Sequence, residues 1–460
     1  MGEPGNIEYD VLVLGAGSGG YATALRAAAL GLSVALIEKD LLGGTCLHNG
    51  CIPTKATLHA AELADSMRAS KSMGIRSTFD GVDVQTLQAF KAATIARLHK
   101  GLQGLVAHNP AITYVEGTGR LLDDRTIDVD GALLRGRHIV LATGSTARTL
   151  PGIPIGGRIL TSTEALALPE IPSSVVIIGG SVIGVEFASA WTSLGASVTV
   201  VESLPTLLPQ EDPAVIKQVE RAFRRRGITV KASAEVTSIH QGQDAVNVGL
   251  ADGTTLKADY ALVAIGRAPA SADLGLASAG VQTERGWVVT DGRLSTNADG
   301  VYAVGDLVSG PQLAHRGFAH GIFVAEEIAG LHPEPVIDAE IPRVTYCQPE
   351  VTSVGLTEPQ AREQFDDIDV VEYSLAGNGK SQILETSGLV KIVRRTEGPV
   401  VGVHLVGARV SEQSGEATLL VGLGLNPDTI SRLIHAHPTQ SEALGEALLA
   451  IAGKPLHTHA

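Results

Sequence analysis

The 460-residue sequence predicts an α/β protein that contains two similar βαβ units and ends in a separate α/β domain. The first observation is a glycine-rich turn between a strand pattern and a helix pattern, which occurs twice. The second is an acid at equal spacing, since 18 residues separate Gly20 from Glu38 and also Gly184 from Glu202. The third is a group of three prolines within residues 333–342, which marks the start of the last domain.

The first βαβ unit has the pattern of a dinucleotide-binding site. It consists of a strand at residues 9–14, a turn at 15–20, a helix at 21–30 and a second strand at 33–37. Gly15 allows the tight turn, Gly17 lets the backbone approach a pyrophosphate, and Gly20 lets the helix pack on the strand. The helix N-terminus attracts the phosphate charge, and Glu38 can accept hydrogen bonds from a ribose diol.

The second βαβ unit follows the same plan. It consists of a strand at 174–178, a turn at 179–184, a helix at 185–194 and a strand at 197–201. Gly179 and Gly184 keep the outer positions of the turn, whereas Ser181 replaces the middle glycine and loosens the approach of a phosphate. Glu202 repels a 2′-phosphate, and residues 203–205 contain no Arg or Lys, so NAD is favoured over NADP. The chain is therefore predicted to hold two Rossmann-like dinucleotide-binding domains.

Two of the three cysteines, Cys46 and Cys51, lie five residues apart. A structural disulfide would close a very small loop and stabilise the fold by only about 2 kcal/mol. A zinc site needs about four ligands, and His48 is the only further local candidate, so no metal site is expected. A redox-active disulfide is the favoured interpretation. Cys347, which has strand-like neighbours, is expected to be a buried small residue.

Composition excludes several classes of protein. Hydrophobic residues make up 44% of the chain and charged residues 18%, which is incompatible with general disorder. The net charge of −14 argues against binding nucleic acid or an anionic membrane surface. There is no apolar run long enough to span a membrane and no signal-peptide pattern. We therefore expect a cytoplasmic protein.

The segment Gly-Gly-Thr-Cys-x4-Cys-Ile-Pro-x-Lys at residues 43–55, placed after a βαβ unit, resembles the flavoprotein disulfide reductases, the pyridine nucleotide-disulfide oxidoreductases of class I. Other segments are similar to this family at residues 142–145, 161–166, 264–269, 296–306, 313–316 and 435–442. The resemblance implies that FAD and NAD are the cofactors. It also implies an FAD domain at 1–145 and 275–335, an NAD domain at 146–274 and a dimerisation domain at 336–460.

The resemblance also assigns residues to the two cofactor sites. Asp306 would bind the ribityl chain of the flavin, and residues 313–316 would lie near its ring. The full set of cofactor-binding residues is Gly15, Gly17, Gly20, Glu38, Gly44, Thr45, Lys55, Gly117, Thr143, Gly144, Ser145, Asp306, Ala314, Gly179, Ser181, Gly184, Glu202 and Gly266.

The catalytic residues implied by the resemblance form three pairs. Cys51 would face the flavin and Cys46 would exchange with the substrate, with a helix after the motif helping to hold a thiolate. His437 would be the base and Glu442 the carboxylate that orients it. Lys55 and Glu186 would meet beside the flavin. His435 is interpreted as structural.

Within the family, the chain resembles the dihydrolipoyl dehydrogenases best. Glu202 favours NAD, and residues 453–460 lack the cysteine pair with which mercuric reductases end. Soluble transhydrogenases generally lack the complete cysteine pair. Between the two cysteines, the dipeptide His48-Asn49 departs from the Asn-Val that is commoner in the family. The implied partners are a second copy of the chain, in a homodimer, and dihydrolipoamide or a lipoyl domain, such as that of a 2-oxoacid dehydrogenase complex.

Two alternatives stay open. The chain could be a related disulfide reductase or an NADH diaphorase that acts on another disulfide, a quinone or a metal. It could instead be a flavin-bound assembly subunit with vestigial chemistry, although the intact set of Cys46, Cys51, His437 and Glu442 argues against that.

Overall fold

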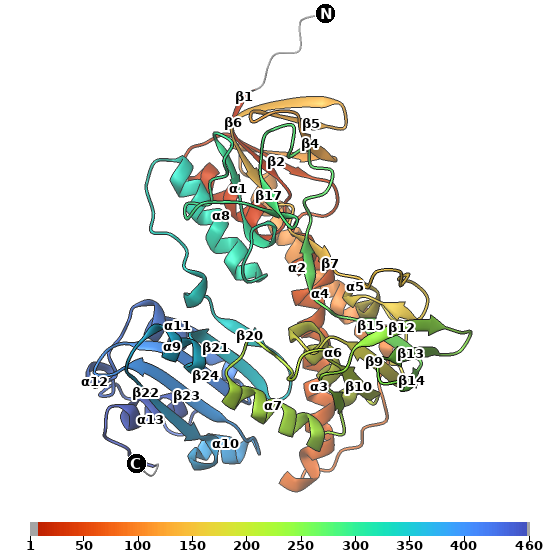
Figure 1. Ribbon diagram of the computed structural model, residues 1–460, viewed down its shortest axis with the longest axis vertical. Coiled ribbons are helices and arrows are strands. Elements are labelled where there is room, and N and C mark those ends of the chain that lie inside the picture. The colour runs from red at the N-terminus through yellow and green to blue at the C-terminus, as the bar shows by residue number, and fades with distance from the viewer. Residues whose placement is uncertain (1–7, 458–460) are drawn as a thin grey trace, which may run out of the picture. The chain divides into compact units, whose positions relative to one another are not determined.

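The structure, a computed structural model, describes residues 8–457 and confirms the α/β class (Figure 1). The chain forms two compact units. The first takes in the residues up to Ala56, Gln85–Arg148 and Arg267–Asp338, and the second takes in Thr57–Val84, Thr149–Gly266 and the residues from Ala339 onward. The finer division into three domains stays a prediction.

The first unit contains a seven-stranded sheet with the order β3-β2-β1-β6-β5-β4, and β19 pairs with β6. These strands are β1 (Glu8–Leu14), β2 (Val34–Glu38), β3 (Ile112–Glu116), β4 (Gly119–Leu121), β5 (Thr126–Val129), β6 (Ala132–Leu141) and β19 (Val301–Ala303). Helices α1 (Ser18–Ala29) and α8 (Ala314–Ile328) pack side by side (Figure 1). Residues 11–13 of β1 are fully buried, because parallel strands are covered on both faces.

The second unit contains a parallel sheet with the order β11-β10-β9-β15-β8. Its strands are β8 (Ile159–Leu160), β9 (Ser174–Ile178), β10 (Ser197–Val201), β11 (Thr229–Lys231) and β15 (Tyr260–Val263). The associated helices are α5 (Ser162–Leu166), α6 (Val182–Leu194) and α7 (Pro213–Arg225). An antiparallel sheet is formed by β12 (Val236–Gln241), β13 (Val246–Leu250) and β14 (Thr255–Ala258).

The C-terminal part of the second unit is an antiparallel sheet with the order β20-β21-β24-β23-β22, accompanied by helices (Figure 1). Its strands are β20 (Arg343–Thr345), β21 (Glu350–Gly355), β22 (Ile368–Ser374), β23 (Leu389–Arg395) and β24 (Val400–Gly407). Its helices are α9 (Glu358–Gln364), α10 (Gly379–Ile383), α11 (Ser414–Gly422), α12 (Pro427–Ile430) and α13 (Glu442–Ile451).

The remaining elements connect these sheets. They are α2 (Gly44–Asn49), α3 (Cys51–Ala69), α4 (Val84–Ala107), β7 (Ser145–Ala147), β16 (Arg267–Pro269), β17 (Thr283–Glu284) and β18 (Trp287–Val288). Short 3-10 helices lie at Ser70–Met73, Gly305–Leu307, Asp338–Glu340, Leu375–Gly377 and Val410–Gln413. Strands β7 and β16 form a two-stranded antiparallel ribbon.

The predicted strands at 174–178 and 197–201 agree with β9 and β10, but three helix positions differ. Helices α1 and α6 begin at Ser18 and Val182, three residues earlier than predicted, because the last residues of each glycine turn are already helical. The helix expected after the redox motif begins inside it. Cys46 lies within α2, and Cys51 is the first residue of α3.

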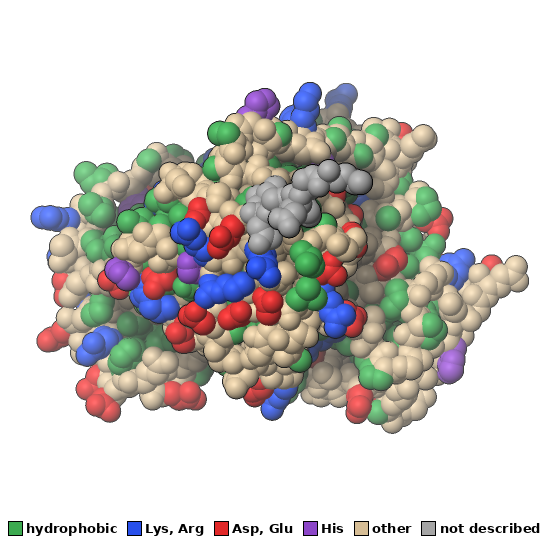
Figure 2. All heavy atoms as spheres, turned by 90° about the horizontal axis from the view of Figure 1, so that it is seen from above, with side chains coloured by type: hydrophobic (Ala, Val, Ile, Leu, Met, Phe, Trp, Pro, Cys, Tyr) green, Lys and Arg blue, Asp and Glu red, His purple; other side chains and the backbone are tan. Residues whose placement is uncertain are grey.

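Basic side chains do not form a separate patch on the face drawn in Figure 2, where Lys and Arg lie among Asp and Glu. Among residues 8–457, no helix combines the length and the apolar character needed to cross a membrane.

Candidate active site

The two glycine turns have the same backbone construction. A Cβ added to Gly20 would lie 1.8 Å from the Gly15 carbonyl oxygen, and one added to Gly184 would lie 1.9 Å from that of Gly179. Gly15 and Gly179 also have φ of +100° and +105°, which side chains rarely tolerate. Both turns therefore require glycine at these positions, as the sequence predicts.

Both turns leave a helix N-terminus open for a phosphate. Gly17 and Ser181 precede α1 and α6, and within the described chain neither helix receives a side-chain cap. Ser181, a residue type that often caps helices, does not cap α6 here. A Cβ at Gly17 would meet nothing within 4 Å, so this position borders open space. The N–H groups of the first turn can therefore face an anion at either site.

The two acids have matching roles in the turns. Glu38 Oε2 accepts a hydrogen bond from the Ala16 N–H at 2.6 Å, and Glu202 Oε2 accepts one from the Gly180 N–H at 2.6 Å. Glu38 also accepts from the Asp40 N–H, and Glu202 also accepts from the Ser203 hydroxyl and the Leu204 N–H. A carboxylate can accept about four hydrogen bonds, so Glu38 keeps about two acceptor positions for a ribose and Glu202 about one. The backbone contacts hold each acid at the carboxyl end of its strand, beside the glycine turn.

The redox motif packs on the first glycine turn. The Gly43 N–H donates to the Ala16 carbonyl oxygen at 2.9 Å. A Cβ added to Gly44 would lie 2.8 Å from Gly17 Cα, so the two backbones approach more closely than a side chain allows. The glycine at residue 44 therefore brings the helix that carries Cys46 against the predicted phosphate site.

Cys46 and Cys51 are partly buried and are not joined by a disulfide in this structure. A hydrogen bond with the Cys51 side chain and burial raise the pKa of the Cys46 thiol, while the charge of Lys55 acts in the opposite direction. The Cys51 contact and burial therefore favour the thiol form of Cys46, and the Lys55 cation opposes them.

Two residues near the cysteines have no assigned role in the sequence-based prediction. Burial, together with the charges of Cys46 and Cys51, raises the pKa of Tyr21 to about 12. Burial lowers the pKa of Arg267, and the charges of Asp306 and Cys51 oppose this effect. Arg267 follows Gly266 in a family-like segment, which is the signal that could have identified it. Tyr21 carries no such signal beyond its place after the turn.

Arg267 is part of a polar network around Asp306. Ser145 Oγ donates to Asp306 Oδ2 at 2.6 Å, and Arg267 Nε donates to Ser145 Oγ at 2.7 Å. Thr143 Oγ1 donates to the Ala270 carbonyl oxygen at 2.8 Å. The network fixes the Asp306 carboxylate, which is predicted to bind the ribityl chain, and joins it to Ser145, a second residue predicted for the FAD site.

The other predicted cofactor residues lie in turns or at helix ends. Gly144 and Gly266 have φ of +73° and +101° and follow β6 and β15. Gly117 has φ of +154°, and a Cβ added there would lie 2.6 Å from Asp130 Oδ2. Thr45 is exposed in α2, and Ala314 begins α8. The placement of residues 313–316 near the flavin ring stays a prediction, and the structure gives the contacts of Arg316. Its side chain donates to Asp338 and to the carbonyl oxygens of residues 305, 308 and 309.

Glu186 is buried in α6, with 4% of its surface exposed, and accepts a hydrogen bond from the Tyr346 N–H at 2.9 Å. Lys55 belongs to the first compact unit and Glu186 to the second. Their pairing beside the flavin stays a prediction.

His437 and Glu442 are brought together as predicted. His437 Nδ1 lies 2.8 Å from Glu442 Oε1 and 3.0 Å from Oε2, and Glu442 is the first residue of α13. The His437 side chain is 73% exposed, so its other nitrogen can face a substrate. Nearby, His435 Nε2 lies 2.7 Å from Glu416 Oε1, and this hydrogen bond raises the pKa of His435.

Cys347 is buried, as predicted, with 2% of its surface exposed. Its Sγ donates to the Pro349 carbonyl oxygen at 3.0 Å. Burial raises the pKa of this thiol, which makes it unreactive. Among the residues that the structure describes, no three His, Cys, Asp or Glu side chains are placed to hold a metal ion.

The first unit fits FAD on its own observations. The α1 N-terminus is open beside the space at Gly17, Glu38 is held next to it, and the Asp306 carboxylate is fixed in the same unit as the cysteine pair. This arrangement suits the predicted roles of these residues, which are to bind a phosphate, a ribose and a ribityl chain, and the roles themselves stay predictions.

Comparison with known proteins agrees with this arrangement. The profile of the pyridine nucleotide-disulphide oxidoreductase family matches residues 9–321, and the profile of the dimerisation domain of that family matches residues 341–448. Dihydrolipoyl dehydrogenase 2, mitochondrial, of Arabidopsis thaliana is 38% identical over 98% of this chain and 92% of its own length. A dihydrolipoyl dehydrogenase of Bacillus subtilis is 37% identical over 98% of this chain and 99% of its own. The crystal structure of LpdA from Mycobacterium tuberculosis superposes with a TM-score of 0.90 at 26% identity, over 96% of this chain and 99% of that one.

Proposed function

The chain belongs to the pyridine nucleotide-disulphide oxidoreductase family, and we propose that, as a member of it, this protein oxidises dihydrolipoamide with NAD, the reaction of a dihydrolipoyl dehydrogenase. The observation that carries the proposal is the position of the cysteine pair. Cys46 lies in α2, which packs on a glycine turn suited to FAD, and Cys51 begins the next helix, α3. The relatives' names indicate the substrate.

The substrate reacts with the oxidised Cys46–Cys51 disulfide. A thiolate of dihydrolipoamide attacks Cys46 Sγ, the Cys46–Cys51 bond breaks, and Cys51 leaves as a thiolate. The second substrate thiol then attacks the substrate sulfur of the mixed disulfide, which closes the ring of lipoamide and releases Cys46. The substrate loses two electrons and the cysteine pair gains them.

FAD and NAD, when bound, supply the chemistry that carries these two electrons away from the cysteine pair. Glu38, the turn at residues 15–20 and Asp306 would hold FAD. Glu202 and the turn at 179–184 would hold NAD, and the carboxylate of Glu202 would disfavour a 2′-phosphate. The Cys51 hydrogen bond and burial raise the pKa of the Cys46 thiol, and the charge of Lys55 would offset part of that rise in favour of the thiolate.

His437 would take the proton of the attacking substrate thiol. The bond between His437 Nδ1 and the Glu442 carboxylate fixes the tautomer, which leaves Nε2 as the acceptor. Glu442 also stabilises the imidazolium that forms. His437 Nε2 therefore takes the proton as the substrate sulfur attacks Cys46.

We propose that the active protein is a homodimer in which His437 of one chain acts on the cysteine pair of the other. The support is the matched dimerisation domain and the apolar surface beside His437, where Leu433 is 62% exposed and Ile434 is 98% exposed. Exposed apolar side chains of this size beside a functional residue are typical of a surface that a partner covers. A cytoplasmic location, as expected from the sequence, would supply the reducing conditions in which the cysteine pair can cycle between dithiol and disulfide.

The test is steady-state turnover of the purified protein. We expect fast reduction of NAD with dihydrolipoamide, much slower reduction of NADP, and little NADH-dependent reduction of glutathione disulfide. If dyes or quinones are reduced by NADH while dihydrolipoamide is not oxidised, the diaphorase alternative replaces this proposal. If neither reaction occurs in FAD-loaded protein, the assembly-subunit alternative replaces the proposal instead.

A further inference from the structure

The segment that joins His437 to Glu442 is anchored by a buried amide. Gln440 lies between these two residues in the sequence, and only 8% of its surface is exposed. Its Oε1 accepts a hydrogen bond from Ser381 Oγ at 2.7 Å, and its Nε2 donates to the Ala408 carbonyl oxygen at 2.7 Å. Both ends of the amide are therefore bonded, which fixes the side chain between α10 and the residue that follows β24.

A second buried amide reaches the same segment from α10. Asn378 immediately precedes this helix and is 2% exposed. Its Oδ1 accepts from the Ser381 N–H at 2.8 Å, which caps the helix, and its Nδ2 donates to the Thr439 carbonyl oxygen at 3.1 Å. The side chain that caps α10 thus also holds the backbone between His437 and Glu442.

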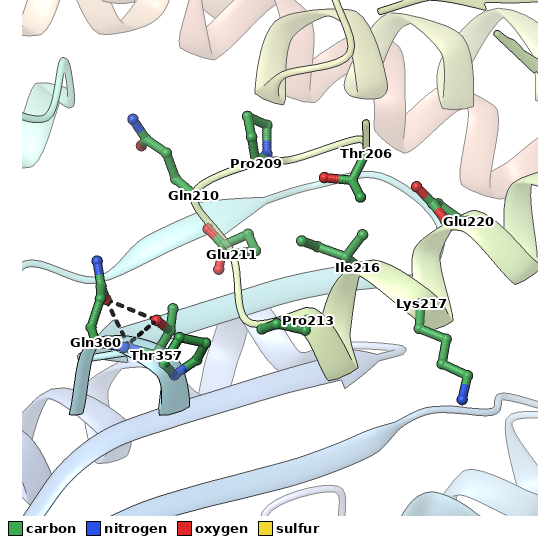
Figure 3. Close-up of a pocket in the computed structure, with 11 residues that line it drawn as sticks. Thr206, Pro209, Gln210, Glu211, Pro213, Ile216, Lys217, Glu220, Thr357 and Gln360 are labelled. Carbon is green, nitrogen blue, oxygen red and sulfur yellow. Dashed lines mark hydrogen bonds between the residues drawn. The ribbon is translucent and has the colours of Figure 1, made fainter. Parts of the chain in front are cut away.

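The cap of α9 shows the more local arrangement. Figure 3 draws this cap beside a cavity of about 520 Å³, whose lining includes the buried Glu211. Thr357 and Gln360 bond to each other there, so both side chains act within α9. Asn378 differs, because its amide nitrogen bonds outside its own helix. The contact with Thr439 is therefore more than capping requires.

The start of α10 also lies against the ring of His437. A Cβ added to Gly379 would lie 3.9 Å from His437 Cε1, the distance of an ordinary contact. The Thr439 hydroxyl accepts from the Glu442 N–H at 3.2 Å and donates to the Ala436 carbonyl oxygen at 2.7 Å. Because the His437 side chain is 73% exposed, its direction depends on this backbone and on the bond to Glu442 more than on close packing.

We propose that Asn378 and Gln440 are positioning residues for the oxidation of dihydrolipoamide. They hold residues 437–442 so that Glu442 stays bonded to His437 Nδ1 and Nε2 points to the substrate thiol. The inference rests on the proposed function, in which His437 takes the proton of that thiol. If the segment shifts, proton transfer slows, while the substrate still reaches the cysteine pair.

The test uses Asn378→Asp in the FAD-loaded protein. Aspartate keeps the acceptor for the Ser381 N–H, and with it the helix cap, but it places an oxygen where the donor to the Thr439 carbonyl oxygen stood. We expect kcat for dihydrolipoamide to fall about tenfold or more at pH 7, and KM to change by less than about twofold, because the base is misplaced while substrate binding is kept.

The loss should shrink as pH rises. Free thiols ionise near about pH 8.5, so at pH 10 the substrate supplies its own thiolate and needs no base. The ratio of wild-type to Asn378→Asp turnover should therefore fall to about twofold or less at pH 10. A defect of folding alone would lower turnover by the same factor at both pH values.

Asn426→Asp is the matched control. Asn426 also caps a helix, α12, and its Nδ2 donates to the Glu397 carbonyl oxygen, but neither contact involves residues 437–442. This variant should keep wild-type turnover at both pH values. Gln440→Met is the second test variant, because it keeps the length of the side chain and removes both of its hydrogen bonds. It should show the same pH-dependent loss, and if one test variant does not fold, the other decides.

A loss of equal size at pH 7 and pH 10 would overturn the proposal, and so would wild-type turnover of the test variants at pH 7. A different result would count against the proposed function itself. If the wild-type protein binds FAD but oxidises no dihydrolipoamide at either pH, that function is wrong and this inference falls with it.

Discussion

At the scale of single residues, the chemistry depends on a few side chains with distinct environments. Cys46 and Cys51 share hydrogen bonding near Lys55, whereas Cys347 is buried and bonded to a carbonyl oxygen. The difference separates a reactive pair from an inert thiol, and it can be tested by replacing each cysteine.

Cys46→Ser and Cys51→Ser should each abolish oxidation of dihydrolipoamide, because serine cannot form the disulfide that the substrate attacks. NADH-dependent dye reduction should remain, since it bypasses the cysteines. Both rates are measured on FAD-loaded protein. Cys347→Ser is the matched control and should keep both activities. Normal turnover of dihydrolipoamide by either of the first two variants would exclude the pair from the reaction.

Glu202 should set the preference for NAD. Glu202→Gln keeps an acceptor for the Gly180 N–H but removes the negative charge, so NAD should bind about tenfold more weakly and NADP should be less disfavoured. The dissociation constants of both nucleotides are measured by titration. Glu235→Gln, at an exposed position of the same unit, should change neither. An unchanged ratio in the Glu202 variant would argue against a contact with the ribose.

At the scale of elements, both βαβ units use one construction, in which a helix packs against the turn that precedes it. Gly20→Ala places a Cβ within 1.8 Å of the Gly15 carbonyl oxygen, so α1 must move and the protein should lose FAD. Flavin content is measured by absorbance after gel filtration. Gly101→Ala in α4 is the control, because nothing lies within 4 Å of its Cβ. That change should retain FAD and stabilise the helix by about 0.5–1 kcal/mol.

The pair of His435 and Glu416 joins α11 to the segment before α13 and should respond to pH. The hydrogen bond to Glu416 raises the pKa of His435 above its usual value near 6.5, so the folded state favours the protonated ring. This contribution to stability is complete below the unfolded pKa and is lost as pH rises through the folded pKa.

Glu416→Gln should therefore destabilise the protein more at pH 6 than at pH 9, as measured by urea unfolding at both values. Glu412→Gln, an exposed acid close by, serves as the control and should show no such dependence. Equal destabilisation at the two pH values would mean that the pair carries no charge-dependent stability.

At the scale of the whole molecule, the proposed active site draws on two chains. A His437→Ala chain mixed with a Cys46→Ser chain should form heterodimers with one intact site, so part of the dihydrolipoamide activity should return. Each variant alone should be inactive, because it lacks either the base or the disulfide. Heterodimers are isolated with two affinity tags before assay. Verified heterodimers without activity would mean that each chain supplies its own base.

Much of the fold was predictable because the relevant signals are local. The turn glycines lie next to the strands and helices that they join, so Gly20 and Gly184 could be assigned from sequence. The predicted start of α3 was several residues too late, because the helix begins at Cys51, inside the redox motif. Its first turn contains a proline, Pro53, which is compatible with an N-terminal helical position but does not reveal where the helix begins.

The sequence by itself determined the two dinucleotide folds, the cysteine pair and the acids at the strand ends, because glycine turns, strand periodicity and residue spacing act over short stretches of chain. Only the tertiary structure decided which distant residues meet. Arg267 reaches Ser145 across 122 positions, and Lys391 reaches Asp212 across 179. The burial of Glu211 with one unsatisfied oxygen likewise depends on how α7 packs near α9. Such contacts arise from the packing of whole elements, and no local pattern of residues encodes them.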